Sequence, residues 1–144
     1  MKLAVITGGG RGIGAAISER LAADGYRILL TYNNDSQSAE SVISKLRQDS
    51  VDCVAVKVDC GRTDEVFILA DHPWMQDGVD ALVLNHGMYH RSPARELTMN
   101  DLQETMNVNF RGAVAVYTAL SKYLSTKASI VAIGSQLGIR GSPH

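Results

Sequence analysis

The stretch that decides the fold is at the N-terminus, where Lys2-Leu-Ala-Val-Ile6 leads directly into Thr7-Gly-Gly-Gly-Arg-Gly-Ile-Gly14. The first part is a short apolar run, typical of a buried β-strand. The second part is a glycine turn, in which Gly8, Gly12 and Gly14 can take positive φ angles and let main-chain N–H groups approach an anion. A pyrophosphate can then rest on the N-terminus of the next helix. The order of strand, turn and helix therefore predicts a nucleotide-binding site.

A helix is expected directly after this turn. Its apolar stripe consists of Ile13, Ile17 and Leu21, and Ser18, Glu19 and Asp24 fall outside that stripe. A glycine turn alone is a weak signal, so the flanking strand and helix carry the argument. A structural strand, turn and helix without a ligand is the alternative.

The remaining apolar runs predict a doubly wound α/β fold. They are short, nearly continuous and rich in β-branched residues, as strands covered on both faces should be, and they span 28–30, 54–58, 81–84 and 130–133. Helical patterns lie between them: Asp35 or Ser36 can cap one helix and Thr63 another, and the stretch 71–78 is expected to be a loop. Right-handed crossovers then give a parallel sheet between two layers of helices, three layers in all, with strand order 3-2-1-4-5 and no strand after the fifth. The ligand is expected at the carboxyl ends of the strands. We expect residues 1–144 to form one domain.

Composition narrows the class of partner. Fourteen basic and fifteen acidic residues leave the chain near neutrality, which argues against a nucleic-acid surface or a polybasic membrane patch. No leader pattern precedes the first strand and no run is long enough to span a bilayer, so we expect a cytoplasmic protein that binds small molecules. Cys53 and Cys60 form no disulfide framework and are expected to be ordinary reduced thiols.

A long helix is predicted from Thr98 to about Leu124, with Asp101 as the capping-box partner of Thr98. Asn109 falls in the middle of its apolar stripe, which comprises Leu102, Met106, Ala113, Val116, Leu120 and Leu124. An unpaired amide on such a face costs about 1 to 3 kcal/mol, so Asn109 should have a purpose. That purpose is either a core amide that bends the helix or a role in chemistry.

Two further places carry polar groups near strand ends. Ser135 follows the fifth predicted strand, where ligands bind in such sheets, although a serine in a glycine-rich turn is more often a turn residue. His86 and His90 are close in sequence, but Gly87 lies between them and no carboxylate or thiol joins them at ligand spacing. We therefore expect no metal site.

The spacing Thr7-Gly8-x-x-x-Gly12-x-Gly14 resembles the glycine loop of the short-chain dehydrogenase/reductase family, whose fold is the dinucleotide-binding Rossmann fold. Asn109-Phe-Arg-Gly112 resembles the V-N-x-x-G segment of the family, whose asparagine holds a water in the proton relay. Ser135 resembles its substrate-orienting serine. Leu84-Asn-His-Gly87 matches the N-N-A-G motif at Asn85 and Gly87 and departs from it at Leu84 and His86. The resemblance implies cofactor contacts from Gly8, Arg11, Gly12, Ile13, Gly14, Tyr32, Asn33, Asp59, Asn85 and Gly87, with Asp59 reading the adenine, and catalytic roles for Asn109 and Ser135.

The end of the second strand favours NADP over NAD. A carboxylate there would accept hydrogen bonds from the ribose hydroxyls of NAD, but the chain has Thr31-Tyr32-Asn33. Arg11 in the glycine loop can meet a 2′-phosphate. The alternative is that Arg11 only covers the pyrophosphate and that Asp35 turns inward to bind NAD.

The proton donor of the family is the tyrosine of a Y-x-x-x-K motif that follows the serine, and the chain reaches His144 without it. Tyr123-x-x-x-Lys127 matches the letters but precedes the fifth strand, so we interpret it as a chance match. The resemblance covers the first half or so of a typical member, most like the 3-oxoacyl-carrier-protein reductase branch. It implies an NADP-dependent oxidoreductase acting on a carbonyl or secondary alcohol, a homo-oligomer through the helix 98–124, and no activity of these 144 residues alone. A non-catalytic dinucleotide-binding module and a structural partner are the alternatives.

Overall fold

The structure is a computed structural model that describes residues 1–140, and the sheet in this part of the chain is five-stranded and parallel. Its strands follow the spatial order β3-β2-β1-β4-β5, which confirms the predicted doubly wound fold and strand order. They are β1 (Leu3–Ile6), β2 (Arg27–Tyr32), β3 (Cys53–Lys57), β4 (Val79–Leu84) and β5 (Leu124–Ala132).

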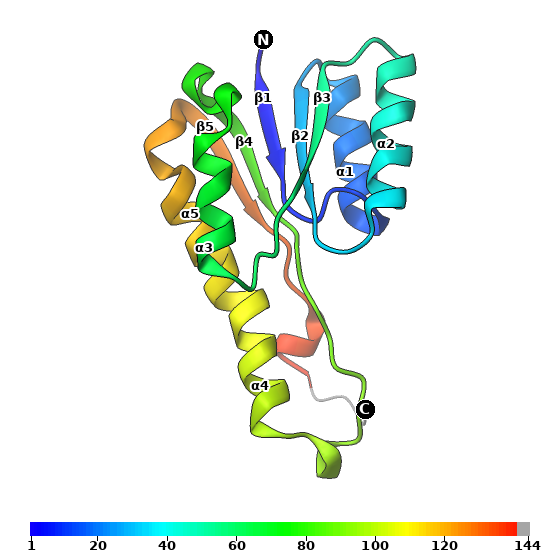
Figure 1. The fold of residues 1–144 in the computed structure, drawn as a ribbon, viewed down its shortest axis with the longest axis vertical. Coiled ribbons are helices and arrows are strands. Elements are labelled where there is room, and N and C mark those ends of the chain that lie inside the picture. Colours follow the sequence, from blue (N-terminus) through cyan, green and yellow to red (C-terminus); the bar gives the residue numbers. More distant parts are fainter. Residues whose placement is uncertain (141–144) are drawn as a thin grey trace.

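Helices cover both faces of this sheet (Figure 1). One face carries α1 (Gly12–Ala23) and α2 (Ser36–Gln48), and the other carries α3 (Thr63–Val66) and α5 (Gly112–Leu120). Successive side chains of a strand point to opposite faces. Leu3 and Val5 of β1 therefore pack with α5, whereas Ala4 and Ile6 pack with α1 and α2. This burial on both sides explains the continuous apolar run.

The first helix buries small residues most deeply, and the predicted stripe is confirmed in part, since Ile17 and Leu21 are partly buried against the core. Gly14, Ser18 and Ala22 are buried, and Ile13 is 64% exposed. The Ser18 hydroxyl donates to the Gly14 carbonyl at 2.9 Å, so its polar group is satisfied within the interface. The prediction that Ser18 lies away from the sheet was wrong, because α1 approaches the glycine turn too closely for larger side chains.

The predicted helix from Thr98 to Leu124 is divided. It consists of α4 (Met99–Met106), a π-helical turn (Asn107–Arg111), α5 and a short 3₁₀ helix (Ser121–Tyr123), after which Leu124 already begins β5. The capping box is confirmed, since Thr98 N–H donates to Asp101 Oδ2 at 2.8 Å and Asp101 N–H donates to Thr98 Oγ1 at 3.2 Å. Leu102 is 53% exposed, so the apolar stripe is not buried along its whole length.

The connections differ from the sequence prediction at two places, the segment 71–78 and the start of α3. The expected loop 71–78 is largely helical, with 3₁₀ helices at Phe67–Asp71 and Pro73–Asp77 that bury Met75 fully. Asp35 caps α2 as predicted, but Thr63 is the first residue of α3 and does not cap it. Further 3₁₀ turns lie at Ala94–Glu96 and Gln136–Gly138. Cys53 and Cys60 are buried free thiols.

The fifth strand is longer and more exposed than predicted. It begins at Leu124 rather than near Ile130, and Ile130 and Val131 remain 46% and 48% exposed. The expectation that this strand is covered on both faces is therefore wrong for the residues that the structure describes. Within residues 1–140, no helix combines the length and the apolar character needed to cross a bilayer.

Candidate dinucleotide site

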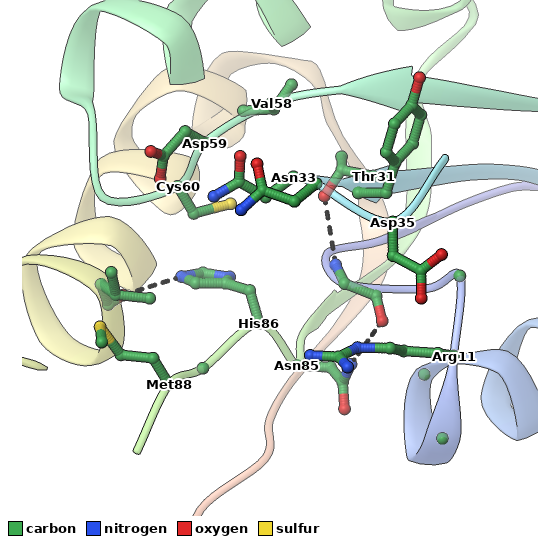
Figure 2. A pocket seen from close by; sticks show the side chains of 18 of the residues that line it. Arg11, Thr31, Asn33, Asp35, Val58, Asp59, Cys60, Asn85, His86 and Met88 are labelled. Carbon is green, nitrogen blue, oxygen red and sulfur yellow. Dashed lines mark hydrogen bonds between the residues drawn. The ribbon is translucent and has the colours of Figure 1, made fainter. Parts of the chain in front are cut away.

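A cavity of about 740 Å³ lies at the carboxyl ends of the central strands. Figure 2 shows labelled side chains from four separate segments around it, Arg11, Asp35, Asp59 and His86 among them. The structure brings together in its lining every residue predicted to bind a cofactor: Gly8, Arg11, Gly12, Ile13, Gly14, Tyr32, Asn33, Asp59, Asn85 and Gly87. The parallel strands all deliver their carboxyl ends to one edge, which is why residues so distant in sequence meet there.

The glycine turn between β1 and α1 has the geometry of an anion site. Gly8 and Gly12 have φ angles of +63° and +53°, in the left-handed region that favours glycine. A Cβ on Gly14 would lie 2.1 Å from the Gly8 carbonyl oxygen, so only glycine fits there. The following helix α1 has no side-chain cap and no acidic residue in its first turn. Its first N–H groups thus remain available to a phosphate.

Thr7 joins this turn to the end of β4. Its Oγ1 accepts the backbone N–H groups of Asn85 and His86 at 3.0 and 3.2 Å. The Asn85 side chain in turn donates to the carbonyls of Thr7 and Gly8, both at 3.0 Å. Thr31 completes the frame, since its Oγ1 accepts the Gly8 N–H at 3.2 Å. Thr7 and Thr31 are buried, and the sequence analysis assigned neither of them a role.

A carboxylate and a guanidinium line the cavity near the end of β2: Asp35, which caps α2, and Arg11 of the glycine turn. Asp35 uses both carboxylate oxygens on Ser38, accepting its N–H at 3.0 Å and its hydroxyl at 2.7 Å. These bonds to Ser38 hold the pKa of Asp35 below its usual value, with a smaller contribution from the nearby charge of Arg11. The Arg11 guanidinium itself has no hydrogen bond or ion pair within residues 1–140. Asn33 lies on the same wall of the cavity.

The segment after β3 forms another wall. Asp59 Oδ1 accepts the Gly61 N–H at 2.9 Å, which fixes the turn on which the carboxylate sits. Cys60 is buried beside it, and burial raises the pKa of its thiol to about 12. Cys60 is therefore a neutral lining group and has no thiolate character at physiological pH.

His86, where the sequence departs from the family motif, fills part of the cavity wall. Its Nδ1 lies 2.7 Å from Thr7 Oγ1, and its Nε2 lies 3.1 Å from the Val108 carbonyl oxygen. Burial lowers the pKa of His86 below its ordinary value, and the bond to Val108 opposes that shift only in part. The uncharged imidazole is thus favoured in the fold.

The two predicted catalytic residues lie outside this lining. Asn109 is exposed rather than buried on an apolar face, and its amide pairs with the backbone of Met88: Oδ1 accepts the N–H at 2.8 Å and Nδ2 donates to the carbonyl at 2.9 Å. Ser135 is exposed, and its Oγ accepts the Leu137 N–H at 3.2 Å. It therefore caps the 3₁₀ helix Gln136–Gly138, as its alternative interpretation as a turn residue implied.

Tyr123 lies at the opposite end of the sheet from the cavity, and Lys127 lies in the first half of β5. Tyr123 precedes the first residue of β5 and packs against the core, and Lys127 is within the strand. The strand has nine residues, so at about 3.3 Å per residue it separates Tyr123 from the cavity edge by roughly 30 Å. This pair cannot act at the cavity.

No group of His, Cys, Asp and Glu side chains within residues 1–140 has the arrangement of a metal site. The structure does bring two carboxylates close to His90, because Glu104 Oε2 lies 3.1 Å from His90 Nε2 and Asp101 Oδ1 lies 3.9 Å from His90 Nδ1. Sequence spacing could not show these contacts, since the loop after β4 folds back onto α4.

Residues 2–144 match the family model of the short chain dehydrogenases, and the chain belongs to that family. An uncharacterized oxidoreductase of Methylorubrum extorquens is 32% identical over 135 residues, which are 93% of this chain and 54% of that protein. The versicolorin reductase of Emericella nidulans is 28% identical over 145 residues, covering 99% of this chain and 55% of that reductase. The chain thus spans about half the length of the curated relatives it matches.

Solved structures agree with this assignment. A short chain dehydrogenase from Burkholderia cenocepacia J2315, in complex with NADP, superposes with a TM-score of 0.92 at 34% identity and covers 98% of this chain and 58% of its own. A blue fluorescent protein from a metagenomic library, in complex with NADPH, gives a TM-score of 0.89 at 35% identity and covers 96% of this chain and 57% of its own. The fold of this chain is therefore that of the short chain dehydrogenases, the family to which it belongs.

Proposed function

We propose that this chain forms the cofactor-binding part of an NADP-dependent oxidoreductase, which transfers hydride between nicotinamide and a small carbonyl compound or secondary alcohol. When bound, the nicotinamide ring supplies or accepts the hydride. Residues 1–144 would make up one dinucleotide-binding domain of a cytoplasmic protein. The near-neutral charge supports a small-molecule substrate rather than a nucleic acid or a membrane.

The proposed preference for NADP rests on the hydrogen-bond partners of Arg11 and Asp35. Arg11 lines the cavity with its guanidinium unpaired among residues 1–140, where it can bind the 2′-phosphate of NADP. Asp35 is the first carboxylate after β2, but Ser38 occupies both of its oxygens. This carboxylate would have to share its oxygens between Ser38 and the ribose hydroxyls of NAD.

The pyrophosphate would lie on the glycine turn and the N-terminus of α1, with Gly12, Ile13 and Gly14 presenting their backbone N–H groups. Tyr32 and Asn33 would flank the adenosine ribose, and Asp59 would accept a hydrogen bond from the adenine amino group. Asn85 would hold the turn in shape through its bonds to the Thr7 and Gly8 carbonyls. Gly87 leaves room at the end of β4 for the nicotinamide half.

We assign Ser135 to orienting the reacting carbonyl or hydroxyl and Asn109 to holding a water molecule of the proton relay. Ser135 would have to exchange its bond to the Leu137 N–H for one to the substrate. Tyr123 and Lys127 lie too far away to supply the proton. We therefore expect the 144-residue polypeptide alone to bind NADP without reducing ketones, and turnover by a purified sample of verified mass would contradict this.

Calorimetric titration with NADP⁺ and NAD⁺ tests the cofactor proposal. A charged hydrogen bond contributes about 1.5 to 3 kcal/mol, so Arg11→Ala should weaken NADP⁺ binding about tenfold or more and leave NAD⁺ binding nearly unchanged. Arg20→Ala is the matched control, because Arg20 lies on the same helix, paired with Asp24 at 3.1 Å. Equal affinity of the wild type for both dinucleotides would contradict the proposal.

The proposal extends to self-association through the region 98–124. Phe110, Val114 and Tyr117 are 60%, 50% and 44% exposed on successive turns, and an exposed apolar patch of this kind is typical of an interface. Tyr123 does not contribute to that patch, because it packs against the core. Light scattering should report an oligomer that Val114→Lys disrupts, and a wild-type monomer would contradict the proposal.

A further inference from the structure

His86 makes two side-chain contacts that connect distant parts of the cavity wall. Its Nδ1 faces Thr7 Oγ1 in the glycine turn at 2.7 Å, and its Nε2 faces the Val108 carbonyl at 3.1 Å. Thr7 directly follows β1 and begins the glycine turn, and Val108 immediately precedes Asn109. One imidazole ring therefore spans from the cofactor turn to the helix that carries a predicted catalytic residue.

The Val108 carbonyl is available because the helix is irregular at that point. In a regular α-helix the Gly112 N–H would donate to the Val108 carbonyl, but here it donates to Asn107 across the π-helical turn. The carbonyl freed in this way is satisfied by the His86 ring. A Cβ added to Gly112 would lie 3.0 Å from His86 Nε2, so the ring packs directly against the turn.

The hydrogen-bond partners of His86 determine which of its ring nitrogens carries a proton. A carbonyl can only accept, so Nε2 must carry a proton. Thr7 Oγ1 already accepts two backbone N–H groups, which occupy both lone pairs of the hydroxyl oxygen. The hydroxyl proton has two possible acceptors, His86 Nδ1 at 2.7 Å and the Val83 carbonyl at 3.2 Å. The shorter distance favours donation to Nδ1. Nδ1 must then be bare. A doubly protonated ring would direct a second donor at a hydroxyl that has no lone pair left.

We propose that His86 is a positioning residue of the dinucleotide site: as a neutral imidazole protonated on Nε2, it holds the glycine turn in register with the π-helical turn beside Asn109. The proposal rests on the proposed function of the cavity and adds a dependence on pH to it. Protonation of His86 breaks one of its two contacts, so the turn loses its support and dinucleotide affinity falls.

No charged group in the part of the chain that the structure describes pairs with His86, so burial and these two contacts determine its charge state. The titratable and charged groups that share the cavity are Arg11 from the glycine turn, Asp35 before α2, Asp59 and Cys60 after β3, and Glu104 from α4. His86 has no ion pair with any carboxylate in residues 1–140. The Cys60 thiol stays neutral, and Glu104 is 3.1 Å from His90.

The test compares NADP⁺ affinity as a function of pH in the wild type, His86→Gln and His72→Gln. Glutamine can still donate an amide hydrogen to Val108 but does not titrate. His72 is the matched control, because it lies in the 72–77 segment away from the cavity, where it contacts Trp74. The 2′-phosphate of NADP⁺ changes its protonation state with pH in the same way for all three proteins. Differences in Kd between the variants therefore report the protonation of the imidazole alone.

We expect the Kd of the wild type to rise up to tenfold for each pH unit below the pKa of His86, relative to His86→Gln, since one pKa unit corresponds to a factor of ten. His72→Gln should follow the wild type. Identical pH profiles for wild type and His86→Gln, or a wild-type affinity that increases on acidification, would overturn the proposal.

A second measurement separates this proposal from the proposed cofactor. ¹⁵N NMR of the histidine rings needs no ligand, and it should show His86 protonated on Nε2 alone at neutral pH, with the Asn109 side-chain amide signals moving as His86 titrates. A ring protonated on Nδ1, or Asn109 signals insensitive to that titration, would overturn the positioning role. Absence of NADP⁺ binding together with the expected NMR result would overturn only the proposed function.

Discussion

Gly14 is the residue at which a single methyl group should disturb the candidate site most. A Cβ there would lie 2.1 Å from the Gly8 carbonyl oxygen and 2.5 Å from Asn85 Nδ2, far inside any real contact. The nearest obstacle is backbone, which cannot rotate away as a flexible side chain can. In Gly14→Ala the glycine turn must therefore open, and Asn85 must give up its bonds to the Thr7 and Gly8 carbonyls.

The magnitude follows from these contacts. Forcing an extra methyl group into a packed site costs about 1 to 3 kcal/mol. Each hydrogen bond lost from Asn85 adds about 0.5 to 1.5 kcal/mol. With two such bonds lost, we expect Gly14→Ala to lower the free energy of unfolding by about 2 to 6 kcal/mol and to weaken dinucleotide binding by more than Arg11→Ala does.

Urea unfolding followed by circular dichroism measures the effect, and Gly12→Ala is the matched control. Gly12 has φ +53° but no atom within 4 Å of an added Cβ, so alanine there meets only the cost of a left-handed conformation, about 1 to 2 kcal/mol. Gly12→Asn should recover part of that loss, because asparagine tolerates this conformation. If Gly14→Ala proved no less stable than Gly12→Ala, the steric argument would be refuted.

Three further predictions concern the core, a thiol and a helix cap. Leu120 is fully buried and Leu102 is 53% exposed, so Leu120→Ala should cost about 2 to 5 kcal/mol in urea unfolding and Leu102→Ala less than about 0.5 kcal/mol; equal losses would contradict the packing described for the two helices. Burial raises the pKa of Cys60 to about 12, so alkylation of its thiol near neutral pH should proceed only as fast as the protein opens. Mass spectrometry measures that rate, and a rate typical of a free thiol would contradict the burial of Cys60. Ser38 holds the pKa of Asp35 low, so the cap stabilises the fold at pH values above the ordinary carboxyl pKa. This stabilisation is lost as the pH falls through the pKa of Asp35 in the folded protein. The difference in Tm between the wild type and Asp35→Ala should therefore shrink in acid, and a difference that is constant with pH would contradict this.

The central strands could be predicted from the sequence because burial on both faces leaves an unambiguous signal. The predicted first strand has the same bounds, Leu3–Ile6, in the structure. The fifth strand lacked that signal, since its first half contains Ser125, Thr126 and Lys127, and its start was therefore placed too late. Strand order followed from right-handed crossovers, which do not depend on the details of individual residues.

The lining of the site was predictable to the extent that local sequence defines it. The glycine spacing located the turn, and topology then brought Asp59 and Asn85 to the same cavity. Their binding of a cofactor stays a prediction. The roles of Thr7 and Thr31 escaped sequence analysis, because their partners are Asn85, His86 and Gly8, which lie 78, 79 and 23 residues away along the chain. Short buried threonines in a strand pattern give no sign of such bonds.

The largest error of the sequence analysis, the placement of Asn109, has one physical cause. An uninterrupted period of 3.6 residues from Thr98 to Leu124 would place Asn109 on one face with Leu102 and Leu120. The π-helical turn takes one extra residue, which rotates everything before it by about 100° relative to everything after it.

Two observations are consistent with that rotation. The Asn109 amide reaches the backbone of Met88, and the Val108 carbonyl is free to accept from His86. The exposure of Leu102 has another cause, because α4 buries none of its residues. A break in helical periodicity normally weakens a helix, and it persists only where other contacts stabilise it. Here the stabilising contacts come from Met88 and His86, both in the segment that follows β4. His86, which departs from the family motif, therefore contacts the irregular turn directly, and the bonds to Met88 hold Asn109 against the segment that follows β4.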